Sequence, residues 1–383
     1  MDATQASGAA SVRERVKSLH RGCGMDQASS FEPGPTARRA SDLADSTTPF
    51  IHNAWYVIAP ANEVSRVPVA RIVLGTSLVL FRRLDGTVVA LQNRCCHRSF
   101  PLSHGTVDGD TIVCGYHGLR YDTDGRCVEI PMQKTVPASM RVRAYTTTEK
   151  GPFVWVWMGR DAPGAAGPPH QSWLEDPEWA VRWGYLHVKG SYVHMHENLL
   201  DLSHLSFLHA KTFGTPEYAR APVEMNCEGD KLEVWRHVQC QLPAIYAKPL
   251  GWQGARAIRS SGSQYVSPGL HVNTGIFRNL DLPTEAQSPQ PMVKVAQLVT
   301  PETATTTHYW TAQARNFATH DAEMGDYMIN AQIEAFKEDA FALERITEMQ
   351  ALASDDQQEF SIPTDKAGVL MRRRLKKLAD LER

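Results

Sequence analysis

The sequence predicts an α+β protein with two domains: an all-β N-terminal domain, and a larger domain in which helices cap an antiparallel sheet. Short runs of β-branched and aromatic residues, separated by turn signals such as Leu-Asp-Gly at 84–86, fill residues 50–160. Further β-like runs occupy residues 231–315. Helical patterns lie before them, around residues 195–210, and after them, at residues 326–351. This order of elements is typical of an antiparallel sheet covered by helices.

Two stretches without periodicity mark the expected domain boundaries. Residues 1–49 are rich in Ala, Ser, Gly, Arg and Asp, and we expect them to form a disordered extension. Residues 161–180 are rich in proline, so we expect a linker there. The all-β domain would then span residues 50–160, and the α+β domain residues 181–383.

Composition and charge exclude several classes of protein. Apolar residues make up 42% and charged residues 21% of the chain, as in soluble globular proteins. The formal net charge of −2 gives no electrostatic support for binding nucleic acid or an anionic membrane. No apolar run approaches the roughly 20 residues that a membrane-spanning helix needs, and the first 25 residues lack the apolar segment of a signal peptide. We therefore expect a cytoplasmic protein that binds neither nucleic acid nor membrane.

The cysteines point to a metal site. They number seven, an odd count that favours metal or core roles over a disulfide scaffold. Two short motifs combine cysteine with histidine: Cys95-x-His97 and, after sixteen intervening residues, Cys114-x-x-His117. A Rieske [2Fe–2S] centre has two thiolates on one iron and two imidazoles on the other. Two loops that each provide one cysteine and one histidine meet that demand.

Other ligand assignments suit this pattern less well. Two cysteines and two histidines also suit Zn²⁺, but zinc sites usually space each ligand pair by about two to four residues, and Cys-x-His is shorter. Cys96 is a rival ligand to Cys95. It would make two ligands adjacent in sequence, whereas Cys95 and His97 project to the same side of an extended loop. We therefore expect Cys95, His97, Cys114 and His117 to hold a [2Fe–2S] cluster.

A second motif, Asp201-x-x-His204-x-x-x-x-His209, suits a mononuclear iron. Non-haem Fe(II) oxygenases hold iron with two histidines and one carboxylate. His204 and His209 would lie about 140° apart around a regular helix, so they share one metal only if the helix breaks or contains a π-bulge. On that helix Asn198 and Asp201 lie on the side of His204, and Asp201 is placed to accept the ring N–H of His204.

The same segment also has plainer interpretations. Leucines at positions 199, 202, 205 and 208 suit an amphipathic core helix with incidental histidines. His194, His196 and Glu197 form another potential metal-binding cluster just upstream. The cysteine–histidine motif earlier in the chain favours His204 and His209 as the ligands.

The third iron ligand is expected in the helical stretch at residues 326–351. An apolar stripe with helical spacing consists of Ile329, Ile333, Phe336, Ala340 and Leu343. Glu338 points to the opposite side of the helix, and Glu334 lies well off the stripe. Asp339 and Glu344 lie on the two flanks of the stripe, so either side chain is able to reach a buried metal.

Residues 93–98 (Asn-Arg-Cys-Cys-His-Arg) and 114–122 resemble the Rieske domain of ring-hydroxylating and demethylating oxygenases. That family usually has proline where this chain has Cys96. Residues 299–317 and 337–339 resemble the C-terminal half of Rieske O-demethylases such as the dicamba and vanillate enzymes. In that group the aspartate of the second segment is an iron ligand, so the resemblance selects Asp339.

The resemblance implies the terminal oxygenase of a multicomponent system. An NAD(P)H-dependent reductase, acting through a ferredoxin, would supply its electrons; no G-x-G-x-x-G follows a strand in this chain. Three identical copies would form a ring in which His117 of one copy meets Asp201 of the next, and Asp201 links to His204. The implied reaction is O₂-dependent O- or N-dealkylation (demethylation) of a small aromatic compound at the mononuclear Fe(II).

Three other functions are compatible with the sequence. The same iron could carry out ring hydroxylation or cis-dihydroxylation. The chain could be an electron-transfer Rieske protein without oxygenase activity, or a zinc-stabilised binding module.

Aromatic and polar residues of the predicted sheet are the candidates for substrate contact. They are Trp235, Tyr265, His271, Asn273, Phe277, Arg278 and Trp310.

Overall fold

The computed structural model describes residues 43–131, 133–165, 167–169, 171–229, 231–352 and 359–382. Most of the extension expected at residues 1–49 lies outside these ranges. Its last seven residues are part of the folded structure. Ala44 is fully buried, its N–H donates to the Arg372 carbonyl (3.1 Å), and its carbonyl accepts from Arg372 Nε (2.6 Å). Ordered chain thus begins before residue 50, because these backbone groups pair with the C-terminal helix.

The N-terminal domain is all-β, as predicted. Its strands form three small antiparallel sheets, with the orders β1-β11-β10, β2-β3-β4-β9 and β5-β6-β7-β8. The strands are β1 (Trp55–Pro60), β2 (Val69–Val73), β3 (Thr76–Arg82), β4 (Val88–Gln92), β5 (Thr106–Asp108), β6 (Thr111–Val113), β7 (Arg120–Tyr121), β8 (Cys127–Glu129), β9 (Ala144–Tyr145), β10 (Thr147–Lys150) and β11 (Phe153–Trp157). Strands β3 and β4 form a hairpin, and Gly86 supplies the positive φ (88°) that its turn requires. The hairpin predicted at residues 84–86 is therefore confirmed.

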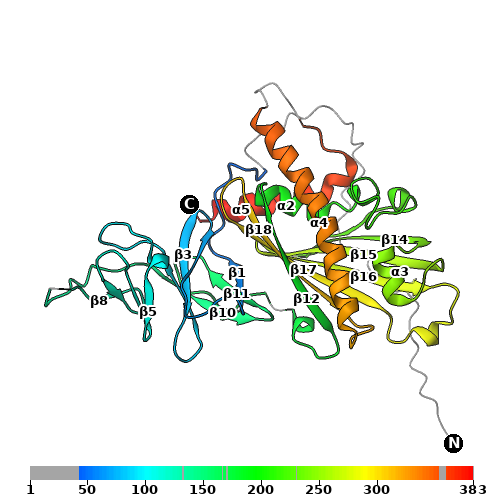
Figure 1. The fold of residues 1–383 in the computed structure, drawn as a ribbon. Coiled ribbons are helices and arrows are strands. Elements are labelled where there is room, and N and C mark those ends of the chain that lie inside the picture. The colour runs from blue at the N-terminus through cyan, green and yellow to red at the C-terminus, as the bar shows by residue number, and fades with distance from the viewer. Residues whose placement is uncertain are drawn as a thin grey trace, which may run out of the picture.

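The larger domain contains a seven-stranded antiparallel sheet of order β12-β18-β17-β16-β15-β14-β13. Its strands are β12 (Ala180–Val188), β13 (Glu224–Asn226), β14 (Leu232–Gln241), β15 (Arg256–Ser267), β16 (Leu270–Asn279), β17 (Met292–Pro301) and β18 (Thr307–Arg315). The α-helices are α2 (Tyr192–Leu200), α3 (Ala244–Leu250), α4 (Ala322–Ala351) and α5 (Lys366–Asp380). Short 3₁₀ turns are η1 (Leu102–His104), η2 (Ser172–Leu174), η3 (His204–Ser206), η4 (Tyr218–Arg220), η5 (Thr284–Gln287) and η6 (Pro363–Asp365). Figure 1 shows α4 running across one face of this sheet, so the predicted helix-capped sheet is confirmed.

The two faces of the sheet have different neighbours. On β18, Trp310 and its alternate neighbours pack in one hydrophobic cluster with Trp55 and Trp155 of the N-terminal domain. The opposite face of β18 meets α4, where Gln332 bonds to both Thr311 and Gln313. Alternation along the strands therefore sends one set of side chains to the domain contact and the other to the helices.

Helix α4 is held by its cap and by its apolar face. Asp321 begins the helix by accepting the Met324 N–H (2.8 Å), and Ile329, Phe336 and Leu343 are buried. These three belong to the predicted stripe. Among the described residues, no helix is long and apolar enough to cross a bilayer.

Candidate metal centres

The two cysteine–histidine motifs form a pair of matching loops. Cys95 follows β4 and Cys114 follows β6. In the first loop the Cys95 N–H donates to the Phe100 carbonyl (2.9 Å) and the Ser99 N–H donates to the Cys95 carbonyl (3.0 Å). In the second loop the Cys114 N–H donates to the Leu119 carbonyl (2.8 Å), and the Gly118 N–H donates to the Cys114 carbonyl (3.0 Å). The two motifs thus have equivalent backbone geometry, although their ligand spacing differs by one residue.

The four side chains of these loops divide into an inner and an outer pair. Cys95 and Cys114 are each 2% exposed, and neither forms a disulfide. His97 and His117 are exposed, and their ring centroids lie 4.6 Å apart. Burial raises the pKa of the Cys114 thiol, so a thiolate there needs the positive charge of a bound metal. Two sulfurs inside and two imidazoles outside fit a [2Fe–2S] cluster with its histidine side toward solvent.

Cys96 differs from Cys95 in its surroundings. Its side chain is exposed, whereas Cys95 faces inward. The Tyr121 hydroxyl lies 3.0 Å from Cys95 Sγ and 3.3 Å from Cys96 Sγ. Cys95 is therefore the cysteine that lies with Cys114 inside the loops.

The second motif does not lie on one helix, which corrects the expected helix around residues 195–210. Helix α2 ends at Leu200, and Asp201 has extended backbone (φ −90°, ψ 102°). The Asp201 carboxylate accepts the Ser203 N–H at 2.6 Å, a local turn that competes with continuing the helix. His204 begins η3, and its carbonyl accepts from two later N–H groups. The chain thus breaks before His204, and the described residues show no π-bulge between His204 and His209.

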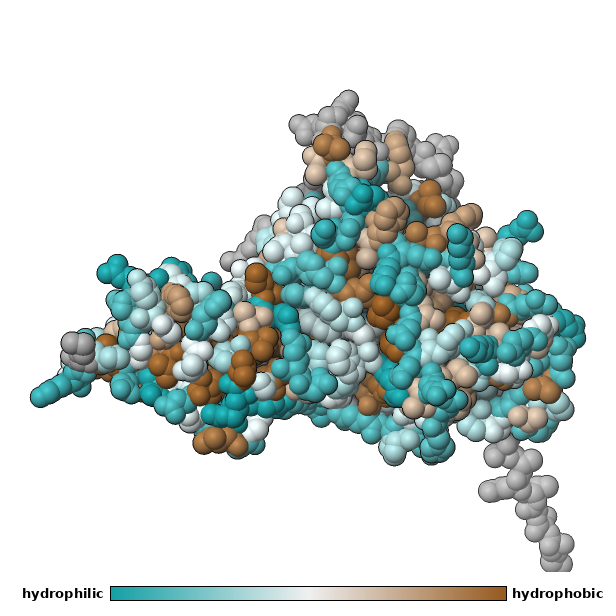
Figure 2. All heavy atoms as spheres, in the orientation of Figure 1, coloured by the Kyte–Doolittle hydropathy of each residue, from teal (hydrophilic) through white to brown (hydrophobic). Residues whose placement is uncertain are grey.

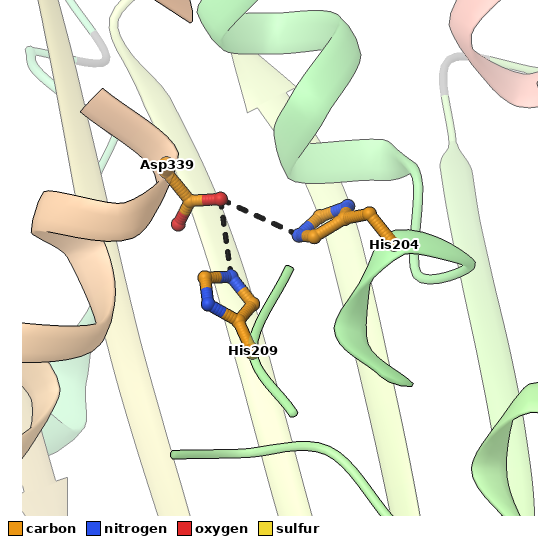
Figure 3. Close-up of side chains that lie close together, drawn as sticks. All are labelled: His204, His209 and Asp339. Atoms are coloured by element: carbon orange, nitrogen blue, oxygen red, sulfur yellow. Dashed lines mark hydrogen bonds and ion pairs between the residues drawn. The ribbon is translucent and has the colours of Figure 1, made fainter. Parts of the chain in front are cut away.

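His204, His209 and Asp339 converge on one point, although His204 begins η3, His209 lies in the turn that follows it, and Asp339 lies on α4 (Figure 3). Asp339 Oδ1 lies 3.1 Å from His209 Nε2 and 3.4 Å from His204 Nε2. One ligand atom from each of the three residues lies within 4.8 Å of the others. Their side chains are 19%, 2% and 7% exposed. Two imidazoles and one carboxylate in this arrangement fit the ligand set of a non-haem Fe(II) site.

Neighbouring side chains fix the orientation of these three. Asn198 donates to Asp339 Oδ1 (2.9 Å), so this predicted site residue lies beside the candidate metal ligands. Asp201 Oδ2 lies 3.8 Å from His204 Nδ1, on the far side of the ring from Asp339. Glu338 Oε2 lies 2.6 Å from His209 Nδ1.

Glu338 was expected to point away from the site, and this expectation is wrong. A helical wheel places it opposite the apolar stripe, but the segment carrying His209 approaches α4 from that side. Thr212, on the same segment, also donates to Glu338 Oε2 (2.8 Å). A helical wheel shows only how residues are placed around one helix, so it does not predict a contact with another segment of the chain.

The charges of the centre are strongly coupled. Burial opposes ionisation of Asp339, but hydrogen bonds from His204 and His209 hold the pKa of its carboxyl well below the usual value. Burial also opposes the charged form of His204, whereas its hydrogen bonds to Asp201 and Asp339 raise its pKa to about 9. Burial would raise the pKa of Asp201 too, yet hydrogen bonds to His204 and Ser203 lower it. A metal ion and a proton therefore compete for His204.

Family models match both parts of the chain. Residues 54–145 match the Rieske [2Fe–2S] domain, and residues 188–381 match the vanillate O-demethylase oxygenase C-terminal domain. The chain belongs to the Rieske oxygenase family. Its cofactors are a [2Fe–2S] cluster and a mononuclear iron, and it is an oxidoreductase. Membership of this family overturns the alternatives of a zinc-stabilised module and of a protein limited to electron transfer.

Individual relatives agree over most of their length. The iron-sulfur subunit of a toluene-4-sulfonate monooxygenase system from Comamonas testosteroni is 34% identical, over 77% of this chain and 87% of the relative. A vanillate O-demethylase oxygenase subunit from Pseudomonas sp. is 33% identical, over 80% and 95%. The crystal structure of dicamba monooxygenase bound to 3,6-dichlorosalicylic acid superposes with a TM-score of 0.82 at 29% identity, covering 87% of this chain and 98% of that one.

The competing ligand candidates of this oxygenase lie elsewhere. The His196 ring is fully buried and bonds through Nδ1 to His271 Nε2 (2.6 Å) and through Nε2 to the Pro268 carbonyl (2.9 Å). Glu344 accepts the Lys189 N–H at 3.5 Å. Neither belongs to the metal-ligand group found among the described residues.

A cavity that is open to solvent adjoins His204, His209 and Asp339, and its empty space, open solvent included, is about 680 Å³. Its walls combine apolar side chains with polar ones from β15, β16, β17 and α4. The apolar members are Leu199, Leu202, Leu205, Phe213, Tyr246, Val293, Val295 and Phe336, and the polar members beyond the iron site are Arg259, Ser261, Asn273, Thr274, Gln297 and Gln332. Such a mixture suits a small, mostly apolar ligand with a few polar groups.

Of the substrate contacts expected from the sequence, only Asn273 lines this cavity. His271 is buried against His196, and Phe277 is buried beneath Tyr246, with ring centroids 4.7 Å apart. Arg278 is exposed on β16, and Trp310 is on the face of β18 turned to the N-terminal domain. Trp235 and Tyr265 are also absent from the cavity lining among the described residues.

Arg259 is a cavity residue that the sequence analysis missed. The signal for it was present, because β15 alternates and places Arg259, Ser261 and Ser263 on one face. A charged residue at an inward position of a buried strand marks a site more sharply than aromatic residues scattered over the sheet.

Proposed function

We propose that this chain is the terminal oxygenase of a multicomponent monooxygenase that O- or N-dealkylates (demethylates) a small aromatic compound. The observation that carries the proposal is the convergence of His204, His209 and Asp339 at the wall of a cavity that combines apolar and polar side chains. A separate NAD(P)H-dependent reductase, through a ferredoxin, supplies the electrons. The substrate proposal is supported by vanillate and dicamba being named in relatives that share both domains.

The proposed ligands follow from the two centres described above. Cys95, His97, Cys114 and His117 hold the [2Fe–2S] cluster. The mononuclear Fe(II) is held by His204, His209 and Asp339, and when bound it supplies the O₂-activating redox chemistry.

The residues of the chain orient the reaction and exclude water. Asn198 and Glu338 fix Asp339 and His209 by hydrogen bonds, so the ligands keep their geometry through turnover. Leu202, Phe213 and Phe336 keep bulk water from the alkyl carbon. In the overall reaction, O₂, two electrons and two protons convert the alkyl C–H to C–OH and release water. The resulting hemiacetal or hemiaminal breaks its C–O or C–N bond, which releases an aldehyde and leaves the rest of the substrate as a phenol or an amine.

Electron delivery is proposed to occur between copies of the chain. Figure 1 shows the β5–β8 sheet, next to the cluster loops, at the end of the molecule away from the larger sheet. The exposed ring of His117 and the Asp201 side chain, 31% exposed, are both available for contact with another copy. We propose a homotrimer in which His117 of one copy meets Asp201 of the next.

The end of α4 offers further surface for this assembly. Phe341, Met349 and Leu352 are more than half exposed there, and Figure 2 shows hydrophobic residues among hydrophilic ones over this helix. Large exposed apolar side chains of this kind are typical of protein interfaces. We propose a cytoplasmic location, where a soluble reductase and NAD(P)H are available.

A substrate panel tests the reaction type. Purified chain, a surrogate reductase and ferredoxin, NADH and O₂ are incubated with methoxy- and N-methyl-arenes, and NADH use and aldehyde release are followed together. We expect one aldehyde per NADH, and no aldehyde from Asp339→Ala. A diol that retains every carbon atom would instead establish the alternative, ring hydroxylation or cis-dihydroxylation at the same iron.

A further inference from the structure

Arg259 is a buried cation in the wall of the cavity. It lies on β15 and is 3% exposed. Its Nε donates to Ser261 Oγ (3.0 Å) and its Nη1 donates to the Phe213 carbonyl (2.6 Å). Its Nη2 donates to no atom of the described residues. Among these residues, no carboxylate lies within 4.0 Å of the Arg259 guanidinium, so none forms an ion pair with it. A guanidinium has five donors in a planar fork, so part of this fork remains available.

The surroundings of Arg259 are positively charged. Both Arg259 and Arg236 lie against the ring of Tyr218, with Cζ-to-centroid distances of 4.9 and 5.2 Å. Arg236 is also 3% exposed, and it donates to the carbonyls of Leu202 and Tyr218. Aromatic faces and carbonyls stabilise these cations in part, but they carry no full negative charge. Two buried cations without a counter-charge among the described residues therefore make this end of the cavity attractive to an anion.

Phe213 connects Arg259 to the iron site. Its carbonyl accepts from Arg259, and its ring centroid lies 5.6 Å from that of His209. The same ring stacks on Tyr246 with a centroid distance of 6.1 Å. A ligand that packs along Phe213 is thus able to contact the guanidinium while another of its atoms lies near the iron ligands.

Two further polar groups of the cavity have no hydrogen-bond partner in the described part of the chain. Asn273 Oδ1 and Gln297 Oε1 are buried without a hydrogen bond, and both residues line the cavity. Buried polar atoms are normally paired, so unpaired ones in a cavity wall mark positions for a polar ligand group.

We propose that Arg259 is a specificity-determining residue, which binds a carboxylate or sulfonate carried by the substrate. This inference rests on the proposed function and deepens it, since it selects aromatic acids over neutral arenes. The guanidinium binds the anion with the part of its fork that the protein leaves free. Asn273 and Gln297 hydrogen-bond a second, neutral substituent.

The test measures binding rather than turnover. Isothermal titration of the oxidised holoenzyme uses three matched probes: 4-methoxybenzoate, 4-methoxybenzenesulfonate and the neutral 4-methoxybenzamide. We expect the wild type to bind at least one of the two anions more tightly than the amide. Arg259→Gln should weaken binding of that anion on the order of 10- to 100-fold, because a hydrogen-bonded charge pair is lost, and should leave the amide unchanged. Arg259→Lys, which keeps the charge, should recover part of the loss.

Arg278→Gln is the matched control. It removes the same charge from the neighbouring strand β16, but its side chain is exposed and outside the cavity. It should change the binding of none of the probes. Iron content and the visible spectrum of the cluster establish that each variant is folded and loaded.

Three results would overturn the inference. The first is a wild type that binds neither anion more tightly than the amide, which is decisive even where an Arg259 variant fails to fold. The second is an anion affinity that Arg259→Gln leaves unchanged. The third is an equal loss for all probes, which would make Arg259 a purely structural residue. Anion binding that depends on Arg259 without aldehyde formation on any substrate would sink the proposed dealkylation instead, and leave the binding role of Arg259 in place.

Discussion

Glu338 and His209 form a hydrogen bond in which the His209 Nδ1–H donates to Glu338 Oε2 at 2.6 Å. His209 is only 2% exposed, and its other nitrogen faces Asp339. A carboxylate on the remote nitrogen of a ligating histidine fixes the tautomer and makes the ring a better electron donor. Glu338 therefore has a defined role next to the proposed iron ligands.

Replacing Glu338 with alanine should weaken iron binding by roughly 10- to 100-fold, because His209 loses the partner that holds its tautomer and orientation. The measurement is iron retained per chain after dialysis against graded concentrations of chelator. Glu334→Ala is the control, since Glu334 is exposed on the same helix and pairs with Lys337. Equal iron retention in the two variants would show that the hydrogen bond has no part in the site.

Asp339→Ala should remove the mononuclear iron and abolish turnover, while the absorption spectrum of the [2Fe–2S] cluster persists. Without the carboxylate, two imidazoles remain to bind Fe(II), too few for a stable site. Glu344→Ala, on the other flank of the helix stripe, should keep its iron. Metal analysis and NADH-dependent O₂ uptake distinguish the two variants, and iron loss in Glu344→Ala instead would transfer the ligand role to that residue.

Cys95→Ser should prevent cluster assembly, and Cys96→Ser should not. Cys95 is buried beside Cys114, whereas Cys96 is exposed, and among the described residues its sulfur lies within hydrogen-bond distance of the Tyr121 hydroxyl alone. The readout is the visible absorption of the purified protein and its EPR signal after reduction. A colourless Cys96→Ser variant beside a brown Cys95→Ser variant would reverse the assignment.

Helical periodicity predicted helix α4, which carries Asp339, because the apolar core packs against one side of this helix. Ile329, Phe336 and Leu343 are buried as the stripe requires, and Asp339 on its flank is buried as well. Periodicity failed for Glu338, since the loop that carries His209 packs on a second side of the helix. A contact between segments about 130 residues apart leaves no trace in the local pattern.

The sequence predicted an irregular helix near His204, but it did not predict the residue at which the helix ends. The angular separation of His204 and His209 required irregular chain between them. The helix in fact ends earlier, at Leu200, because the Asp201 carboxylate bonds to the N–H two residues later. Aspartate is compatible with both a helix and such a turn, and tertiary contacts choose between them.

The prediction of substrate contacts was wrong for a different reason. Period-two alternation separates the two faces of a strand, but it does not say which face meets the cavity. Trp310 and Thr311 are both buried, but they lie on opposite faces of β18. The face that carries Trp310 is covered by the N-terminal domain, and the sequence pattern does not predict this docking.

Asp201→Asn should retain both metal centres and lower turnover on the order of 10- to 100-fold, because the amide is a poorer partner for the Nδ1–H of His204 and carries no charge. The measurement is single turnover from a reduced cluster: its reoxidation by O₂ and substrate should slow by the same factor. Ser206→Ala is the control, since Ser206 lies in the same turn as His204 and its hydroxyl donates to the Thr215 carbonyl. Normal reoxidation in Asp201→Asn would remove Asp201 from the electron route.

The buried pair of His196 and His271 should make the protein sensitive to acid. His196 donates Nε2–H to the Pro268 carbonyl and its Nδ1 accepts from His271 Nε2, an arrangement that requires the His196 ring to be neutral. Burial lowers the pKa of His196 to about 4, and it lowers that of His271 well below the usual value. In the unfolded chain these two histidines take up protons near pH 6.5. Their contribution to the free energy of unfolding is therefore fully present above that pH and is lost as the pH falls toward 4.

Between about pH 7.5 and about pH 5.5, His196 alone should cost about 1.4 kcal/mol of unfolding free energy. Urea unfolding at both pH values measures the difference, with tryptophan fluorescence and cluster absorbance followed together. His196→Gln should reduce the pH dependence by that amount, whatever its effect on stability at neutral pH. His320→Gln, which changes an exposed histidine, should keep the wild-type dependence. An unchanged pH dependence in His196→Gln would mean that the buried ring takes up its proton without opening the structure.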